Sequence, residues 1–159
     1  MRLPRRRRRP AGPRWRPLPP SPRLSWRGWS PPAPAVLTGA ALVFGYGTVV
    51  HVVQLAAGGL DPYPTMPTWL AVYFVALTVL DATAVVLLVR RPAAGLVFGA
   101  FVLVTDALAN GWANYVVDQA DGVTPGRIGQ AVISALAVIL IVALPRTLGA
   151  LSTRTPPPG

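Results

Sequence analysis

The chain has 159 residues, of which 52% are hydrophobic, and it carries fifteen arginines and five aspartates without lysine, glutamate or cysteine. The hydrophobic residues are grouped in long blocks, which excludes an ordinary soluble domain. The absence of cysteine excludes a disulfide framework and a thiolate metal site. The net charge of +10 does not indicate a nucleic-acid-binding domain, because ten of the arginines precede Pro31.

The first part of the chain, residues 1–34, is rich in arginine and proline and includes the run Arg5 to Arg9. Such a composition buries too little apolar surface to offset the entropy of ordering, so it predicts a disordered cytoplasmic tail. Arginines mixed with tryptophans also occur in single-stranded nucleic-acid binders. We favour a membrane-surface anchor and no nucleic-acid partner, because arginines next to a bilayer are attracted to anionic lipids by about 1 kcal/mol each.

Four apolar runs follow, at residues 35–57, 68–89, 93–115 and 128–144. A helix needs about 20 residues to cross the hydrocarbon, so the first three runs are long enough and the fourth, with 17 residues, is at the short edge. The first run lacks a small-residue cleavage site, and we expect it to be retained rather than removed as an export signal. The sequence therefore predicts an all-α, membrane-embedded bundle of four transmembrane helices, followed by a short disordered cytoplasmic end at residues 145–159.

The arginines predict the orientation of this bundle. With the amino terminus in the cytoplasm, fourteen arginines lie on the inner side, and both termini are cytoplasmic in a multi-pass protein of the plasma membrane. Arg127 alone falls at the outer boundary, where its stem could snorkel to the headgroups. An aromatic belt at this outer boundary is formed by Trp69, Trp112 and Tyr115.

Three ionisable residues lie within the runs: His51, Asp81 and Asp106. At a rise of about 1.5 Å per residue, His51 and three other polar residues lie roughly 8 Å to the outer side of the centre, which predicts one polar layer. Asp106, about 3 Å to the outer side, is expected within reach of His51 if the first and third helices adjoin. Asp81 is expected to stand apart. The three further members of the layer are Tyr73, Asn110 and Gln130.

Helical spacing groups some of these residues into stripes. Asp106, Asn110 and Asn114 recur at intervals of four and must face protein or water. Gly47, His51 and Gln54 share a stripe on the first helix, where the glycine would admit a neighbouring backbone, and Gly95 and Gly99 form a small-residue step that indicates a helix contact. The candidate ligand site comprises His51, Gln54, Tyr73, Asp81, Asp106, Asn110, Asn114 and Gln130.

Three interpretations of these polar residues are open. They can hydrogen-bond helices together, they can line a ligand pocket or proton path, or they can catalyse a reaction. A single histidine without cysteine argues against a metal site, although a His/Asp/Asp site stays open. No phosphate-binding loop, nucleophile elbow or zinc-protease motif is present, so the sequence predicts no cofactor and a non-enzymatic protein.

Two resemblances add expectations. Residues 35–144 resemble the small four-span integral membrane proteins of actinobacteria by their organisation. His51, Tyr63-Pro64, Pro67-Thr68-Trp69 and an acid in the second run are similar to the emopamil-binding and sigma-2 receptor family, with Asp81 where that family has a glutamate nearer the tryptophan. The second resemblance implies four spans and a site for sterol-like molecules or hydrophobic amines, or an intramembrane sterol isomerase.

The sequence thus predicts a non-enzymatic membrane protein whose polar layer stabilises the bundle. The main alternative is a carrier, binding a small hydrophobic molecule or coupled to protons, that uses His51, Asp81 and Asp106. An intramembrane lipid or sterol isomerase is the third. Because four helices make a small transporter, transport would favour a homo-oligomer.

Overall fold

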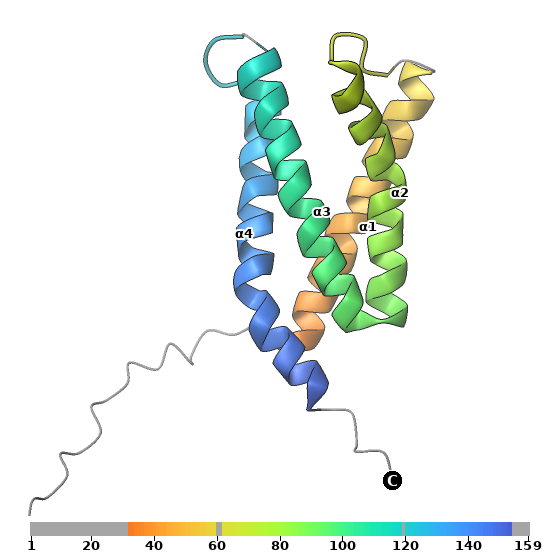
Figure 1. The fold of residues 1–159 in the computed structure, drawn as a ribbon, viewed down its shortest axis with the longest axis vertical. Helices are drawn as coiled ribbons and strands as arrows, with labels where there is room; N and C mark the ends of the chain where they lie inside the picture. The colour runs from red at the N-terminus through yellow and green to blue at the C-terminus, as the bar shows by residue number, and fades with distance from the viewer. Residues whose placement is uncertain (1–31, 60–61, 119, 154–159) are drawn as a thin grey trace, which may run out of the picture.

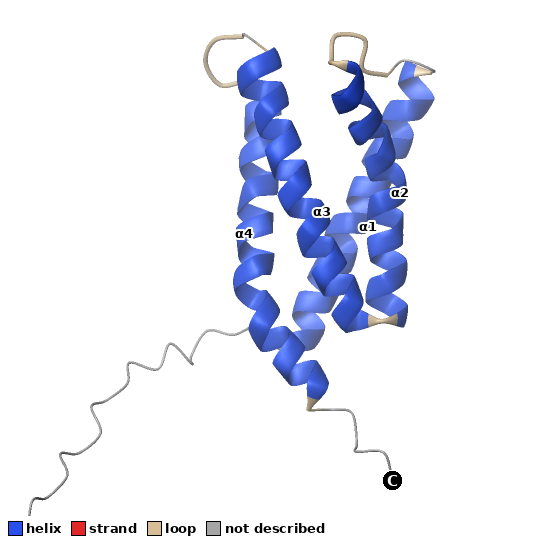
Figure 2. Ribbon diagram, viewed as in Figure 1, coloured by secondary structure: helices blue, strands red, loops and turns tan. Residues whose placement is uncertain are grey.

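The computed structural model describes residues 32–59, 62–118 and 120–153, and their regular structure is entirely helical (Figure 2). Of the predicted disordered segments, residues 1–34 and 145–159, the parts at residues 1–31 and 154–159 lie outside the described residues. The prediction is wrong for residues 33–34 and 145–152, which are helical because α1 begins at Ala33 and α4 continues to Ser152. The predicted all-α class is confirmed. The helices are α1, Ala33–Gly58; α2, Thr68–Arg90; α3, Pro92–Trp112, continued by the π-helix η2, Ala113–Val117; and α4, Pro125–Ser152.

The helices run up and down in chain order and form two hairpin-like pairs, α1 with α2 and α3 with α4, joined by packing of α2 on α3 (Figure 1). One end of the bundle holds the start of α1, the tight connection between α2 and α3, and the end of α4. We call it the arginine end, because Arg90, Arg91 and Arg146 lie there. The other end, with the longer connections after α1 and after the π-helix, is called the loop end.

Prolines and a threonine mark where the helices begin. Prolines occupy the first turn of α1, α3 and α4, a position where the missing N–H costs no hydrogen bond. The Thr124 hydroxyl caps α4 by accepting from the Arg127 backbone N–H at 3.2 Å. Gly59, with φ of 64°, ends α1 in a left-handed conformation that glycine adopts without strain.

The fourth helix is longer than the fourth apolar run, with 28 residues in α4 against the 17 of residues 128–144. The apolar run counts only hydrophobic residues, whereas the helix continues through polar residues at both ends. It also continues through Pro145, although a proline inside a helix removes one backbone hydrogen bond. Helical structure at the end of α3 likewise continues to Val117 as a π-helix, in which the Asp118 N–H donates to the Ala113 carbonyl at 2.8 Å.

The core is concentrated in the half of the bundle towards the arginine end. A Cβ added to Gly95 would overlap the backbone of Leu88, so α3 and α2 touch there backbone to backbone. A Cβ added to Gly99 would lie 2.6 Å from the ring of Phe44, which is 1% exposed. The helix contact predicted at Gly95 and Gly99 is therefore confirmed, and it brings α1, α2 and α3 together in one packed layer.

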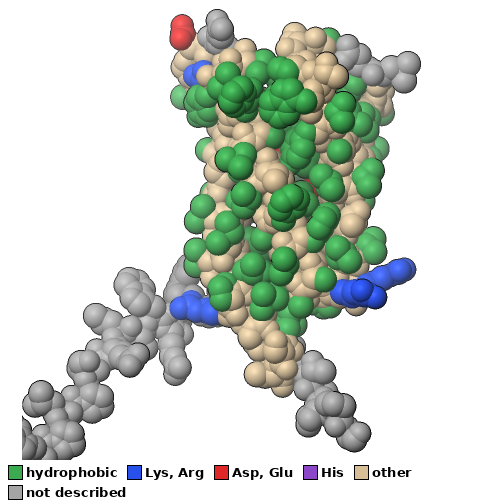
Figure 3. All heavy atoms as spheres, in the orientation of Figure 1, with side chains coloured by type: hydrophobic (Ala, Val, Ile, Leu, Met, Phe, Trp, Pro, Cys, Tyr) green, Lys and Arg blue, Asp and Glu red, His purple; other side chains and the backbone are tan. Residues whose placement is uncertain are grey.

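Each of the four helices is long and apolar enough to cross a membrane, with a mean hydropathy of 1.8 for α1 and for α3 with its π-helix, and 2.4 for α2 and α4. Hydrophobic side chains cover the face seen in Figure 3, and arginine side chains appear only near its two ends. Trp69 and Trp112, both about half exposed, lie with their ring centres 6.3 Å apart at the loop end. This distribution suits a helix bundle surrounded by lipid.

Candidate functional site

A cavity of about 1150 Å³ occupies the half of the bundle towards the loop end. All four helices line it, together with residues of both loops, such as Thr65, Met66 and Asp118. Its lining is largely apolar and includes His51, Asp81 and Asp106. None of the described residues that line it is an arginine.

One wall of the cavity, formed by α1 and α2, carries His51 and Asp81. The His51 Nε2 atom lies 3.8 Å from Asp81 Oδ2, within ion-pair distance. The His51 Nδ1 atom lies 3.1 Å from the Gln54 side-chain carbonyl oxygen, to which the Tyr63 hydroxyl also donates at 2.8 Å. A Cβ added to Gly47 would overlap the Asp81 carboxylate, so this glycine leaves the space that the carboxylate occupies.

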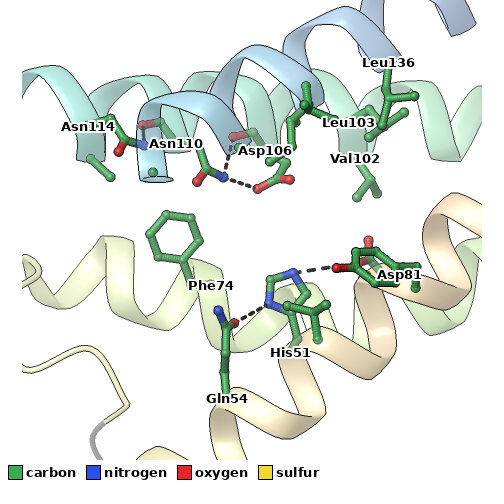
Figure 4. Close-up of a pocket in the computed structure, with 18 of the residues that line it drawn as sticks. His51, Gln54, Phe74, Asp81, Val102, Leu103, Asp106, Asn110, Asn114 and Leu136 are labelled. Carbon is green, nitrogen blue, oxygen red and sulfur yellow. Dashed lines mark hydrogen bonds and ion pairs between the residues drawn. The ribbon is translucent and has the colours of Figure 1, made fainter. Parts of the chain in front are cut away.

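The opposite wall carries Asp106, Asn110 and Asn114 on α3 and its π-helix (Figure 4). The Asn110 amide donates to the Asp106 carboxylate at 2.7 Å and to the Asp106 backbone carbonyl at 3.1 Å. The Asn114 amide donates to the Asn110 carbonyl at 2.8 Å. These three side-chain bonds stay within α3 and its π-helix, and the stripe faces the cavity.

Tyr73 and Gln130 are not among the residues that line the cavity. The Tyr73 hydroxyl donates to the Thr105 hydroxyl at 2.9 Å and so links α2 to α3. The Gln130 amide donates to the Ala107 carbonyl at 2.7 Å and so links α4 to α3. The predicted single polar layer is wrong in this respect, because depth along a helix does not say which face a side chain occupies. Six of the eight candidate residues line the cavity: His51, Gln54, Asp81, Asp106, Asn110 and Asn114.

The predicted pairing of His51 with Asp106 is also wrong. The ion-pair partner of His51 is Asp81, the residue expected to stand apart. Depth along a helix does not say which helices adjoin, and α1 packs directly on α2 and contacts α3 much less. Figure 4 shows His51 and Asp106 on opposite walls, pointing towards the space between them.

The predicted approach of a backbone at Gly47 is replaced in the structure by the approach of a side chain, the Asp81 carboxylate. A Cβ added to Gly126 would similarly overlap the Asn114 side-chain oxygen, so the start of α4 also fits closely around a polar group. Both glycines therefore make room for polar side chains of the cavity walls.

Two residues outside the predicted candidate set support the site: Tyr63 lines the cavity, and Arg127 ties the loop beside it. Tyr63, in the loop after α1, holds the Gln54 side chain and packs on Phe74 with ring centres 5.3 Å apart. Burial, and to a smaller extent the negative charge of Asp106, raises the pKa of Tyr63 above its ordinary value. The sequence marks this tyrosine only through the resemblance that includes Tyr63-Pro64, and helical spacing does not indicate its contact with Gln54, because the two residues are nine positions apart across a turn.

The other is Arg127, which was expected to snorkel. Its guanidinium donates to the backbone carbonyls of Asn114, Ala120 and Gly122, and it lies 5.1 Å from the ring centre of Tyr115. It therefore ties the loop between the π-helix and α4 to the end of α3, where unpaired carbonyl groups favour a cation.

The geometry does not gather a metal site: in the described part of the chain, no three carboxylate or imidazole groups lie close enough to hold an ion. Comparisons of the chain with models of protein families, with curated proteins and with solved structures gave no match. The two resemblances in the sequence accordingly stay predictions.

Proposed function

We propose that this chain is a four-span integral membrane protein whose cavity binds a small, mostly apolar organic cation. The observation that supports this proposal best is the composition of the cavity wall. The described residues that line this largely apolar space include three carboxylates, those of Asp81, Asp106 and Asp118, and their one basic side chain is that of His51.

A carboxylate in a membrane interior is costly, about 2.5–3.5 kcal/mol at the centre of a helix, and it is found mainly where it has a partner or a function. The hydrogen-bond partner of the Asp106 carboxylate is Asn110, one turn away on the same helix. That bond leaves the negative charge in place and adds nothing to the contact between helices. Interhelical stabilisation, the role first expected of this residue, therefore explains Asp106 poorly, whereas a cationic ligand would neutralise it.

The stabilising role fits other polar residues better. Hydrogen bonds between helices are made by Tyr73, Gln130 and Arg127, and His51 on α1 lies within ion-pair distance of Asp81 on α2. These contacts hold the walls around the cavity. The proposed protein is thus non-enzymatic, with one set of polar residues that joins helices and another, centred on Asp106, that faces the ligand.

A binding measurement with tetraphenylphosphonium tests this function, because this probe is apolar and permanently charged. We expect saturable binding to the purified wild-type protein by titration calorimetry. In Asp106→Asn the affinity should fall about ten- to one-hundred-fold, because an interaction with a charged group contributes about 1.5–3 kcal/mol. Asp121→Asn is the matched control, since Asp121 is exposed and does not line the cavity. Equal affinity in both variants, or no binding to the wild type, would contradict the proposal.

The proposed orientation places the arginine end in the cytoplasm and the loop end outside the plasma membrane. The distribution of arginines supports it, since Arg90, Arg91 and Arg146 lie at one end and the tail of ten arginines precedes α1 at that same end. We propose that this tail contacts anionic lipids. A reporter fused after Gly159 should be active only in the cytoplasm, and one inserted at Asp121 only outside; the reverse pattern would overturn the orientation.

We propose that the chain forms a homo-oligomer when it acts as a carrier, because the four helices of one copy enclose little space for a transport path. Cross-linking in intact membranes tests it: a ladder that stops at the dimer supports this form, and a monomer alone contradicts it.

A further inference from the structure

The side-chain carbonyl oxygen of Gln54 accepts from two directions. The Tyr63 hydroxyl donates to it at 2.8 Å, and the Nδ1 atom of His51 lies 3.1 Å from it. A carbonyl oxygen has no hydrogen to give, so the Nδ1 atom must carry the proton in this contact. In the neutral ring, the Nε2 atom is then the unprotonated nitrogen, and it faces Asp81 Oδ2 at 3.8 Å.

We propose that Gln54, held by Tyr63, is a positioning residue that keeps His51 in the Nδ1–H tautomer, and that His51 and Asp81 together carry a proton which a bound organic cation displaces. The second half of this proposal rests on the proposed function. It extends that function from binding to exchange: the cation enters the cavity as a proton leaves.

Charge balance in a largely apolar cavity gives the reason for the exchange. With a proton on either the imidazole or the carboxyl group, the His51 and Asp81 pair has the same total charge, and without that proton it is more negative by one unit. A cation near Asp81 stabilises the more negative state. The N–H bond on Nε2, or the O–H bond on Asp81, then breaks, and the proton passes to water, so the charge inside the cavity stays constant.

The separation of 3.8 Å is longer than a hydrogen bond, so the two groups are coupled by charge, and each exchanges its proton with water. His51 has 16% and Asp81 has 9% of its side chain exposed, enough for limited access. The other titratable groups that line the cavity or act on the pair are Tyr46 on α1, Tyr63 in the loop after α1, Tyr73 on α2, Asp106 on α3 and Asp118 after the π-helix. The described residues of α4 contribute no titratable side chain to the cavity lining.

The first test uses the fact that His51 is the only histidine in the chain. Protein labelled with ¹⁵N-histidine gives a single pair of ring nitrogen resonances, whose positions distinguish the two tautomers directly. We expect Nδ1 to be protonated and Nε2 unprotonated in the wild type at a pH where the ring is neutral. Finding the Nε2–H tautomer there would overturn the positioning role.

Variants of Gln54 and Tyr63 show whether the contact sets the tautomer. Gln54→Leu removes the acceptor and should give a mixture of tautomers or the Nε2–H form, whereas Gln54→Glu keeps an acceptor oxygen and should keep the wild-type tautomer. Tyr63→Phe leaves the Gln54 side chain less constrained and should give a population of the Nδ1–H tautomer between those of the wild type and Gln54→Leu. If Gln54→Leu does not fold, Tyr63→Phe still tests the positioning role. A wild-type tautomer in both Gln54→Leu and Tyr63→Phe would show that Gln54 has no positioning role.

The second test counts protons during binding of tetraphenylphosphonium, which has no proton of its own. Calorimetry in two buffers of different ionisation enthalpy gives the number released, and we expect about one proton for the wild type and close to none for Asp81→Asn. Binding without proton release would overturn the exchange and leave the proposed function standing. Absence of binding would remove both the function and the exchange, while the tautomer experiment would still decide the role of Gln54.

Discussion

The two halves of the bundle differ in packing, although each of the four helices is apolar enough to cross a membrane. Towards the arginine end, residues of all four helices are buried, and Gly95 brings α3 against the backbone of α2. Towards the loop end, the described parts of α1 and α4 contribute no buried residue, since those of α1 end at Phe44 and those of α4 begin at Ala137. In Figure 1 the pair of α1 and α2 diverges from the pair of α3 and α4 towards the loop end.

This contrast indicates what opens the cavity. The polar residues of the helices, such as Asp106, Asn110 and Asn114, lie mainly in the loop-end half, where they line the cavity. Small residues in the other half have the opposite effect, because a helix contact in lipid depends on close packing rather than on removal of apolar surface from water.

In the half towards the arginine end, Gly95 and Gly99 let the helices pack closely, and we call it the closed half. In the half towards the loop end, the space beside Gly47 holds the Asp81 carboxylate and polar side chains line the cavity, and we call it the open half. Stability should therefore depend mainly on the closed half, and ligand binding on the open half.

The largest expected effect is on the closed half, in Gly95→Ala. The new Cβ would overlap the backbone of Leu88, which cannot rotate away as a side chain can. Overpacking of a core usually costs about 1–3 kcal/mol, and the backbone contact places this change at about 3 kcal/mol of unfolding free energy. Thermal unfolding of the purified protein and the yield of folded material should both fall.

Gly45→Ala is the matched control, because no atom lies within 4 Å of a Cβ at that position. It should be neutral or stabilising by up to about 1 kcal/mol, the difference in helix propensity between the two residues. If Gly95→Ala and Gly45→Ala unfold at the same temperature, the close contact of α2 with α3 does not stabilise the bundle, and the contrast between the halves is lost.

The next effect concerns the loop end, in Arg127→Ala. This change removes the hydrogen-bond donors to the carbonyl groups of Asn114, Ala120 and Gly122. The bonds to Ala120 and Gly122 are exposed, and the bond to Asn114 is partly buried. We expect a loss of about 1–2 kcal/mol in unfolding free energy and faster hydrogen exchange in residues 113–124 than in the arginine end. Arg127→Lys keeps the charge without the forked guanidinium and should recover only part of the loss. Full recovery by lysine would mean that charge alone is important there.

Gly47→Ala should affect binding more than stability. The added methyl group would displace the Asp81 carboxylate from its place beside His51, in a region where the walls can move apart. We expect about a tenfold loss of tetraphenylphosphonium affinity, equal to about 1.4 kcal/mol, with a smaller change in thermal unfolding. Gly45→Ala, two residues earlier on α1, again serves as control. A stability loss as large as that of Gly95→Ala would place Gly47 in the closed half instead.

The fold follows from the sequence more completely than the site does. Four long apolar runs, separated by prolines, glycines and charged residues, were sufficient to predict four helices, because length and composition decide whether a helix can cross a membrane. The contact at Gly95 and Gly99 was also predictable, since small residues at this spacing allow helices to approach.

The pairing inside the site was not predictable from depth alone. Which side chains meet depends on which helices adjoin and how each is rotated, and Asp81 faces His51 because α1 packs on α2 with Gly47 between them. The role of Tyr63 depends on the path of the loop after α1, and the continuation of α4 through Pro145 depends on packing that outweighs local propensity.

The smallest expected effect is a pH dependence that originates in the open half at Tyr63. Its pKa in the folded protein is raised by burial and then by the charge of Asp106, so above about pH 10 the unfolded chain loses the proton while the folded protein keeps it. Stability should therefore fall as pH rises from this ordinary value through the folded pKa, by a few tenths of a kcal/mol for a half-buried group.

Unfolding midpoints measured between about pH 8 and 11 should decline less steeply in Tyr63→Phe than in the wild type. Parallel curves for the wild type and Tyr63→Phe would show that the tyrosine is as solvated as an unfolded one, and that the loop after α1 does not close over the cavity.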